Sequence, residues 1–457
     1  MGTTQKLAEF VVETKFKDIS QKAVRIIQEH CLDCIGVTLA GSVHEAGKII
    51  TKLTKARRCA PEAGVIAGGF RTSSTDAALA NGCMAHALDY DDHTLANPFN
   101  PIHPSVSLVP VVLALGEKLS RSGQEVLAAY MLGTEVMAKI ALNCAPPGHT
   151  IGWHPTSLFG TIGAAVAAAK LLQLNVEQTR IALGIACSET GGLRQNFGTM
   201  TKPFHAGMAA SNGILAALLA KEGFTANTDV FDDPGAFTGT FFRNGKCEII
   251  KMAENLGNPF TIEARRVAIK RYPCAGCNAN GLDATLQLLE EKGISYGEVE
   301  LVEAHVNPFI PMVLLYHEPK TGLEAKFSAE YNLAAAILDR KVNLASYAEE
   351  KVNSPKMREA LRKVKIIEHP EWQTRVGGTV IVIKLKDGTT YKNQVEMWKG
   401  SPDMPLSLEE LMEKYRDCAR SVMSPEETEQ SIQLVLNLPE LDNIKELMDI
   451  LTQASVS

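Results

Sequence analysis

The most unusual stretch of this chain lies between residues 86 and 103, where three carboxylates and three imidazoles occur close together. The carboxylates are Asp89, Asp91 and Asp92, and the imidazoles are His86, His93 and His103. Such a set indicates either a metal site or an acid/base cluster, because both groups bind divalent ions and imidazole titrates near neutral pH. The structural alternative is that the aspartates cap a following turn. Spacing alone leaves both interpretations open.

Three further strings place a cation or an imidazole beside a proline or glycine turn. They are GWHPTS at 152–157, GTMTKPFH at 198–205 and KRYPC at 270–274. Rigid turns can hold a charged group at the rim of a cleft, although lysine and arginine are usually only solvated. Together the strings supply a set suited to an anionic substrate, namely His154, His205, Lys202, Lys270 and Arg271.

The elements that must position these side chains are mostly helical. From Ser20 to about Glu254, apolar residues recur at helical spacing in alanine-rich segments such as TIGAAVAAAKLLQL. This pattern predicts a compact helical domain whose small residues let helices approach closely. Cys31 and Cys34 fall inside one predicted helix, so we interpret this CxxC pair as core residues, not as half of a zinc site with Cys274 and Cys277.

Around residue 265 the pattern changes to short β-rich runs. TVIVIKLK and TTYKNQVE flank Asp387-Gly388, and an Asp-Gly pair between such runs is a strong hairpin signal. We therefore expect a smaller α/β unit at 265–398. Its predicted helices span 280–291, 326–338 and 355–364.

Helices return after residue 400, each with an N-terminal capping box. Ser407 precedes Glu410 by three residues, and Ser424 precedes Glu427 in the same way. This tail is expected to pack on the helical domain. The predicted fold is therefore mainly α, with a large all-helical domain from 1–264 together with 399–457, and an α/β (α+β) lid domain at 265–398.

Composition argues against several classes of protein. Lys plus Arg total 46 and Asp plus Glu total 52, which gives a net charge of −6, and we find no basic run. Nucleic-acid and anionic-membrane partners are therefore not expected. No apolar stretch approaches the roughly 20 residues that cross a bilayer, and the N-terminus lacks an apolar signal core. We expect a soluble, cytoplasmic protein with reduced cysteines.

Several uncommon strings, taken in order along the chain, resemble the MmgE/PrpD family. They are NGCMAHALDYDDH with HPS, GWHPTSLFGTIGAAVAAAKLL, GTMTKPFHAG, KRYPC and HEPKTGLEAKFSAEY. The family includes 2-methylcitrate dehydratases, cis-aconitate decarboxylases and iminodisuccinate epimerases. The resemblance implies a helical domain built from both chain ends, an α/β lid, a homodimer, and catalysis without a metal or organic cofactor.

The resemblance also implies roles for individual residues. The motif positions of the family's active-site groups fall on Asp89, His103, His154, Lys202 and Lys270. His103 and His154 are then the acid/base pair, Asp89 orients an imidazole, and the two lysines stabilise a carbanion. Further substrate contacts are expected from Arg271, His93, Tyr316 and His205, of which His205 is alternatively a packed or supporting imidazole.

The expected function is a cofactor-independent lyase acting on a small di- or tricarboxylate, by dehydration or decarboxylation. An epimerase or racemase of a related dicarboxylate is the alternative enzyme, and a non-catalytic ligand-binding homologue is the alternative of another class. Two departures from the family pattern bear on this choice. His93 intervenes before Thr94 and the loop to His103 is longer, and Asn278-Ala279 replaces a Thr-His pair.

Overall fold

The computed structural model describes residues 2–94, 102–144, 151–233, 235–242, 247–264, 267–372 and 378–454. The chain divides into two compact units. The first comprises Met1–Asn196, Met200–Val267 and Ser407–Ser457, and the second comprises Phe197–Thr199 and Ala268–Leu406. The main divisions follow residues 267 and 406, whereas the sequence suggested 264 and 398.

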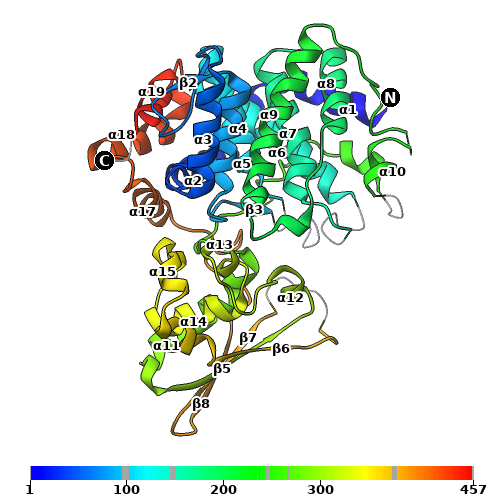
Figure 1. Cartoon of the computed structure of the whole chain (residues 1–457). Helices are drawn as coiled ribbons and strands as arrows, with labels where there is room; N and C mark the ends of the chain where they lie inside the picture. The colour runs from blue at the N-terminus through cyan, green and yellow to red at the C-terminus, as the bar shows by residue number, and fades with distance from the viewer. Residues whose placement is uncertain are drawn as a thin grey trace. The chain divides into compact units, whose positions relative to one another are not determined.

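The first unit is built mainly from helices (Figure 1), and it also contains three strands of two residues each. Its longer helices are α1 (Thr3–Glu13), α2 (Gln21–Ser42), α3 (Glu45–Arg57), α4 (Ser74–His86), α5 (Pro104–Lys118), α6 (Gly123–Leu142), α7 (Pro155–Leu171), α8 (Val176–Ser188), α9 (Thr201–Lys221), α17 (Leu408–Ala419), α18 (Pro425–Leu436) and α19 (Lys445–Gln453), with the short α10 (Phe237–Phe241). The strands are β1 (Ala63–Gly64), β2 (Arg71–Thr72) and β3 (His93–Thr94), and β4 (Val267–Ala268) lies where the chain passes into the second unit.

The C-terminal tail returns to the first unit, as expected. Helices α17 and α18 pack on α2, so the two ends of the chain share one core (Figure 1). Both predicted capping boxes are confirmed, because Ser407 and Ser424 each accept a hydrogen bond from the backbone three residues on. Cys31 and Cys34 are buried on α2.

Helices α4 and α9 run close together because glycines face each other at their contact. A Cβ atom added to Gly82 would lie 2.9 Å from Cα of Gly207, and one added to Gly207 would lie 2.3 Å from the carbonyl oxygen of Leu79. The C-terminal end of α4, at His86, therefore lies near the N-terminal end of α9, which carries Lys202. This contact therefore brings the aspartate and histidine string that begins at His86 close to the string that contains Lys202.

Replacing Gly207 by alanine should lower the stability of the fold. The added methyl group collides with backbone atoms that cannot move without separating α4 from α9. Overpacking of this kind costs about 1–3 kcal/mol, which lowers the apparent Tm by several degrees. Thermal unfolding followed by circular dichroism measures the change. Gly297→Ala is the matched control, since its Cβ would meet open space, and equal Tm values for the two variants would contradict this account of the contact.

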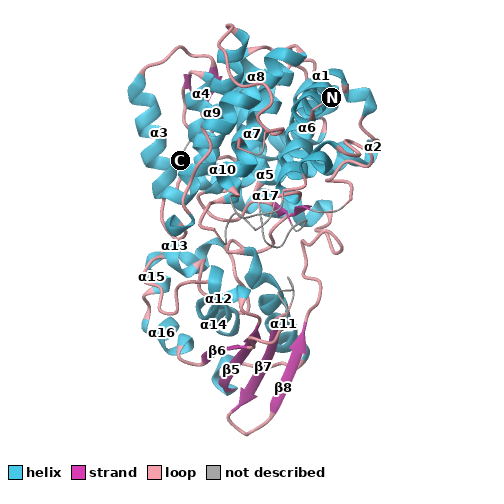
Figure 2. Ribbon diagram, turned by 90° about the vertical axis from the view of Figure 1, so that its right-hand side faces the viewer, coloured by secondary structure: helices cyan, strands magenta, loops and turns pink. Residues whose placement is uncertain are grey.

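The second unit contains a four-stranded mixed sheet in the order β6-β5-β7-β8 (Figure 2). The strands are β5 (Val299–Val306), β6 (Val364–Glu368), β7 (Val380–Leu385) and β8 (Thr390–Gln394). β5 and β6 are parallel, and the other two pairs are antiparallel. The predicted Asp387-Gly388 hairpin joins β7 to β8, and Gly388 has a φ of 88°, which glycine adopts without steric cost.

Helices α11 (Ala279–Glu291) and α14 (Ala329–Asp339) pack against this sheet and each other. The shorter helices are α12 (Phe309–Val313), α13 (Gly322–Ala325), α15 (Glu349–Val352) and α16 (Pro355–Leu361). Two predicted helix boundaries were wrong. α14 begins after residue 328 and not at 326, because the Ser328 hydroxyl caps it by accepting from the Tyr331 backbone. The last predicted helix ends at Leu361, since Val364 already belongs to β6.

Among the described residues, no helix combines the length and the apolar character needed to cross a lipid bilayer.

Candidate active site

Two histidines of the candidate site stand at helix N-termini, each followed by proline. His103 is the N-cap of α5 and His154 is the N-cap of α7, with Pro104 and Pro155 in the first helical position. A residue before proline is confined to extended backbone, whereas proline itself suits the first turn of a helix. Each His-Pro pair therefore starts a helix and holds its imidazole at the positive end of the helix dipole.

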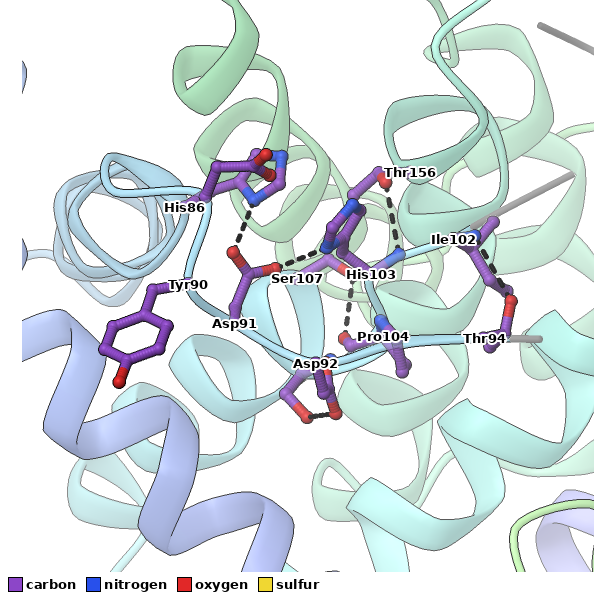
Figure 3. Close-up of polar contacts among 12 residues, drawn as sticks. His86, Tyr90, Asp91, Asp92, Thr94, Ile102, His103, Pro104, Ser107 and Thr156 are labelled. Atoms are coloured by element: carbon purple, nitrogen blue, oxygen red, sulfur yellow. Dashed lines mark hydrogen bonds and ion pairs between the residues drawn. The ribbon is translucent and has the colours of Figure 1, made fainter. Parts of the chain in front are cut away.

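Asp91 lies between two imidazole rings (Figure 3). Its Oδ1 is 2.9 Å from Nδ1 of His86, and its Oδ2 is 2.6 Å from Nδ1 of His103. Burial by itself would raise the pKa of this carboxyl group, but the charges and hydrogen bonds of the two histidines hold the pKa well below its usual value. Asp91 is therefore an ionised carboxylate that orients both rings.

Asp89 has a different partner. Its Oδ1 accepts a hydrogen bond of 2.7 Å from Nζ of Lys202, and both side chains are buried. The backbone of Asp89 is left-handed, with a φ of 50°, so the chain turns sharply after α4 ends at His86. The sequence assigned orientation of an imidazole to Asp89, but the structure places Asp91 against the rings of His86 and His103 and Asp89 against an ammonium group.

His154 and His205 form a buried pair of weakly basic imidazoles. Their Nδ1 atoms are 3.1 Å apart, so one ring donates to the other. Burial first, and then the positive charge of Lys202, lower the pKa of His154 well below its ordinary value. Burial and the charges of His86 and Lys202 lower the pKa of His205 to about 4. Both rings are thus neutral at pH 7.

These shifts predict that the fold loses stability on acidification between pH 6.5 and 4. The unfolded chain protonates a histidine near pH 6.5, whereas folded His205 does so only near pH 4, so the unfolded state binds more protons in this window. His205 therefore contributes stability that is present above pH 6.5 and is lost as the pH falls toward 4. Apparent Tm measured against pH should therefore fall less in His205→Gln than in wild type. His317→Gln, at an exposed histidine, should keep the wild-type slope, and a wild-type slope in His205→Gln would contradict the assignment.

A second buried network fixes the start of α5. Asp92 accepts hydrogen bonds from the backbone and the hydroxyl of Ser105, and its Oδ2 is 2.6 Å from Nδ1 of His30. The Ser105 hydroxyl is also 2.7 Å from the Tyr130 hydroxyl. Because Ser105 lies in the first turn of α5, this network ties the aspartate segment to the helix that carries His103.

The C-terminal helix α17 supports the same segment through a buried lysine. Nζ of Lys414 is 2.6 Å from Oδ1 of Asp33 on α2 and donates 2.8 Å to the Tyr90 carbonyl oxygen. The ammonium group also lies 3.8 Å from the centre of the Tyr90 ring, which points away from the contacts around Asp91 in Figure 3. Lys414 is therefore a positioning residue that holds the backbone between Asp89 and Asp91.

The structure gathers most of the predicted site residues in the first unit. His93 is buried there, with its ring centre 6.1 Å from that of His103. The longer loop expected before His103 falls at 95–101, outside the described residues, and the Thr94 and Ile102 backbones that flank it are hydrogen-bonded. The residues brought together are Asp89, His93, His103, His154, Lys202 and His205.

The remaining predicted residues belong to the second unit. Lys270 is buried, and half-exposed Arg271 lies 3.5 Å from Asp283, which also accepts from the Tyr272 hydroxyl. The Tyr316 hydroxyl donates to the Phe197 carbonyl oxygen at 3.2 Å within the same unit. Roles in catalysis or substrate binding for Lys270, Arg271 and Tyr316 stay predictions.

Sequence reasoning missed the positions that organise the site. His86 and Asp91 were visible in the aspartate and histidine string, but nothing in the string distinguished Asp91 from its neighbours. His30, Asp33 and Lys414 are far away in the sequence and gave no signal. Their contribution depends on the packing of α2 and α17 beside α4.

The same side chains also satisfy the geometry of a metal site. His86, Asp89, Asp91 and His103 place one ligand atom each within 4.8 Å of one another. The charges, however, are already balanced by protein groups. The Lys202 ammonium neutralises Asp89, and Asp91 is ion-paired with histidine. The donor set therefore does not require a cation, although it could accept one.

Comparison with known proteins identifies the family to which this chain is related. The family models described as MmgE/PrpD N-terminal domain and MmgE/PrpD C-terminal domain match residues 5–250 and 272–440. The relatives include proteins named cis-aconitate decarboxylase from Mus musculus, 31% identical over 100% of this chain and 94% of the relative, and from Homo sapiens, 30% identical over 98% and 94%. One from Aspergillus terreus is 28% identical over 85% and 83%. The chain therefore belongs to the MmgE/PrpD family.

Proposed function

We propose that this protein is a carboxy-lyase that removes CO2 from cis-aconitate or a closely similar tricarboxylate. The observation that carries the proposal is similarity along the whole chain to relatives named cis-aconitate decarboxylase. A buried site with an ionised Asp91, a paired His103 and a Lys202 ammonium supports the same chemistry. Family membership supports the coarser statement that the protein is a lyase acting on a carboxylate.

The substrate dictates what the site must do. In cis-aconitate one carboxylate is carried by a methylene group next to the double bond. When the bond between that methylene and its carboxylate breaks, CO2 leaves and the electron pair spreads over a three-carbon allyl system. The other end of this system bears a second carboxylate. The site must therefore bind several negative charges, stabilise the allyl carbanion and supply one proton.

Lys202 supplies the positive charge. Its ammonium group lies in a buried environment, where a preorganised charge stabilises a developing anion more strongly than it would in water. The N-termini of α5 and α7 add positive potential at His103 and His154. In this proposal the Asp89 carboxylate holds the ammonium group in place before the substrate arrives.

His103 supplies the proton. Asp91 engages its Nδ1, so proton transfer to the carbanion occurs from Nε2. The Asp91 carboxylate stabilises the imidazolium form that must precede this transfer. His154 and His205 are neutral and serve as hydrogen-bond partners for substrate carboxylates. Reprotonation by water then restores the imidazolium, and the product is a five-carbon dicarboxylate with a terminal methylene group.

Incubation of the purified protein with cis-aconitate, 2-methylcitrate and an iminodisuccinate-type dicarboxylate tests the proposal. Mass spectrometry should detect loss of CO2 from cis-aconitate. Loss of water from 2-methylcitrate would make the protein a hydro-lyase, and inversion at unchanged mass would make it an epimerase. No reaction with any of the three would favour the ligand-binding alternative.

A homodimer and a cytoplasmic location stay predictions from the sequence.

Exhaustive treatment with EDTA should leave the turnover rate unchanged. The positive charge that the carbanion requires comes from Lys202, and the four potential metal ligands are balanced by protein groups. The measurement is kcat before and after chelation, with metal content determined by elemental analysis. Activity that is lost on chelation and restored by a divalent ion would contradict this prediction and assign a metal to His86, Asp89, Asp91 and His103.

A further inference from the structure

A second pair of facing imidazoles lies in the second unit and has no part in the proposed reaction. His305 is on β5, and His369 follows the parallel strand β6, where its backbone N–H donates to the Val306 carbonyl oxygen. Nδ1 of His305 is 2.9 Å from Nε2 of His369, with the ring centres 5.2 Å apart. Neighbouring parallel strands thus hold two imidazole nitrogens at fixed positions.

Carboxylates occupy the outer side of each ring. Nδ1 of His369 is 3.0 Å from Oε1 of Glu371, and Nε2 of His305 is 3.8 Å from Oε2 of Glu303. An ionised carboxylate only accepts hydrogen bonds, so Nδ1 of His369 donates to Glu371 and its Nε2 faces His305 as an acceptor. Nδ1 of His305 then donates to Nε2 of His369 at 2.9 Å, whereas Glu303 at 3.8 Å is too far for a hydrogen bond with His305. A metal ion that replaces this one shared proton would bind the same two inner nitrogens.

The contact of His369 with Glu371 matches the surroundings of a protein metal ligand. Histidines that bind metals usually donate their other N–H to a carboxylate, which fixes the tautomer and makes the ligating nitrogen more basic. Zn–N bonds of about 2.0–2.1 Å place two tetrahedral ligands about 3.3 Å apart. The present separation of 2.9 Å therefore needs to widen by only about 0.4 Å on binding.

We propose that His305 and His369 form a binding site for a divalent transition-metal ion of the zinc class. Water molecules complete the coordination, and the carboxylates of Glu303 and Glu371 balance the charge. Imidazole ligands favour such ions over Mg²⁺ and Ca²⁺, which prefer oxygen. The side chains of His305 and His369 are 25% and 27% exposed, so an ion reaches them from solvent.

Trp372 provides a local reporter for this site. Its ring stacks on His369, with the centres 4.4 Å apart and the planes inclined by 12°. Cu²⁺ bound at the adjacent imidazole should quench the fluorescence of Trp372, and Zn²⁺, which does not quench, should reverse the effect by competition. Trp153, in the first unit, lies edge-on to Phe241, with the ring centres 5.3 Å apart.

The test is a Cu²⁺ titration of the EDTA-treated, dialysed full-length protein, followed by Zn²⁺ competition and by calorimetry with Zn²⁺ alone. Wild type should show saturable quenching, and His305→Ala should weaken binding at least tenfold while leaving the stack of Trp372 on His369 intact. His369→Ala is a second variant with the same expected loss in calorimetry. His317→Ala is the matched control, since His317 has a carboxylate partner, Glu330 at 2.7 Å, but no contact with an imidazole of the described residues.

Binding at the candidate active site must be distinguished from binding here. His103→Asn removes a ligand of the first-unit cluster and should leave the Trp372 signal unchanged. Equal quenching in wild type and His305→Ala would overturn the proposal. It would also be overturned by absence of saturable binding up to 1 mM Zn²⁺, in which case a shared proton alone lies between the rings. None of these results depends on the decarboxylase activity.

Discussion

Replacing His103 by asparagine should lower kcat at least about 100-fold while the fold stays intact. The asparagine amide can still donate to Asp91, as Nδ1 of His103 does at 2.6 Å, but it cannot transfer a proton near neutral pH. Loss of a general acid typically costs a factor of 10² to 10⁴. The measurement is steady-state turnover of cis-aconitate, with circular dichroism to verify folding.

The comparison with His103→Ala separates proton transfer from structure. Alanine also removes the donor to Asp91, a buried carboxylate, so His103→Ala should be less stable than His103→Asn but similarly inactive. His317→Asn controls for the loss of a histidine as such and should keep wild-type turnover. Wild-type kcat in His103→Asn would remove His103 from the mechanism.

Replacing Lys202 by methionine should lower kcat by a factor of about 10² to 10³. That is the usual cost of removing one preorganised donor from a site where negative charge develops. The reduction in kcat should exceed any increase in KM, because the ammonium group stabilises the carbanion more than the substrate. Separate determination of kcat and KM tests this expectation.

Two variants control for the loss of a buried charge. Lys202→Met leaves Asp89 buried beside a neutral side chain, so the double variant with Asp89→Asn should recover stability but not turnover. Lys170→Met removes another partly buried lysine of the first unit, whose ammonium group donates to backbone carbonyls of Val11, Val12 and Thr14. The Lys170→Met variant should differ from wild type in Tm, but its kcat should stay near the wild-type value. Equal effects of Lys202→Met and Lys170→Met on kcat would contradict the role of Lys202.

Much of the fold could be predicted from local signals. The capping boxes at Ser407 and Ser424 and the hairpin at Asp387-Gly388 depend on residues within a few positions of each other. The His-Pro pairs are equally local signals, although they were expected only as rigid turns and not as helix starts. Where a prediction failed, a competing local interaction decided the outcome. The Ser328 cap delays the start of α14.

The chemistry of the site was only partly visible in the sequence. The residue types and the family resemblance pointed to His103 and Lys202. The spacing could not show which aspartate forms an ion pair with the lysine and which one contacts the histidines. The left-handed turn at Asp89 directs its carboxylate to Lys202 and leaves Asp91 for the imidazoles. The pairing of His305 with His369 depends on the parallel register of β5 and β6 across more than 60 intervening residues, which no local pattern contains.

The most direct test of the proposed decarboxylation is the reaction of cis-aconitate in heavy water, followed by proton NMR. We expect loss of CO2 and one deuterium per product molecule, on the allylic carbon that bears a carboxylate, because the proton of His103 comes from solvent. Deuterium exchange into a substrate that keeps all three carboxylates, or turnover without deuterium at that carbon, would rule out proton delivery by His103 to a decarboxylated carbanion.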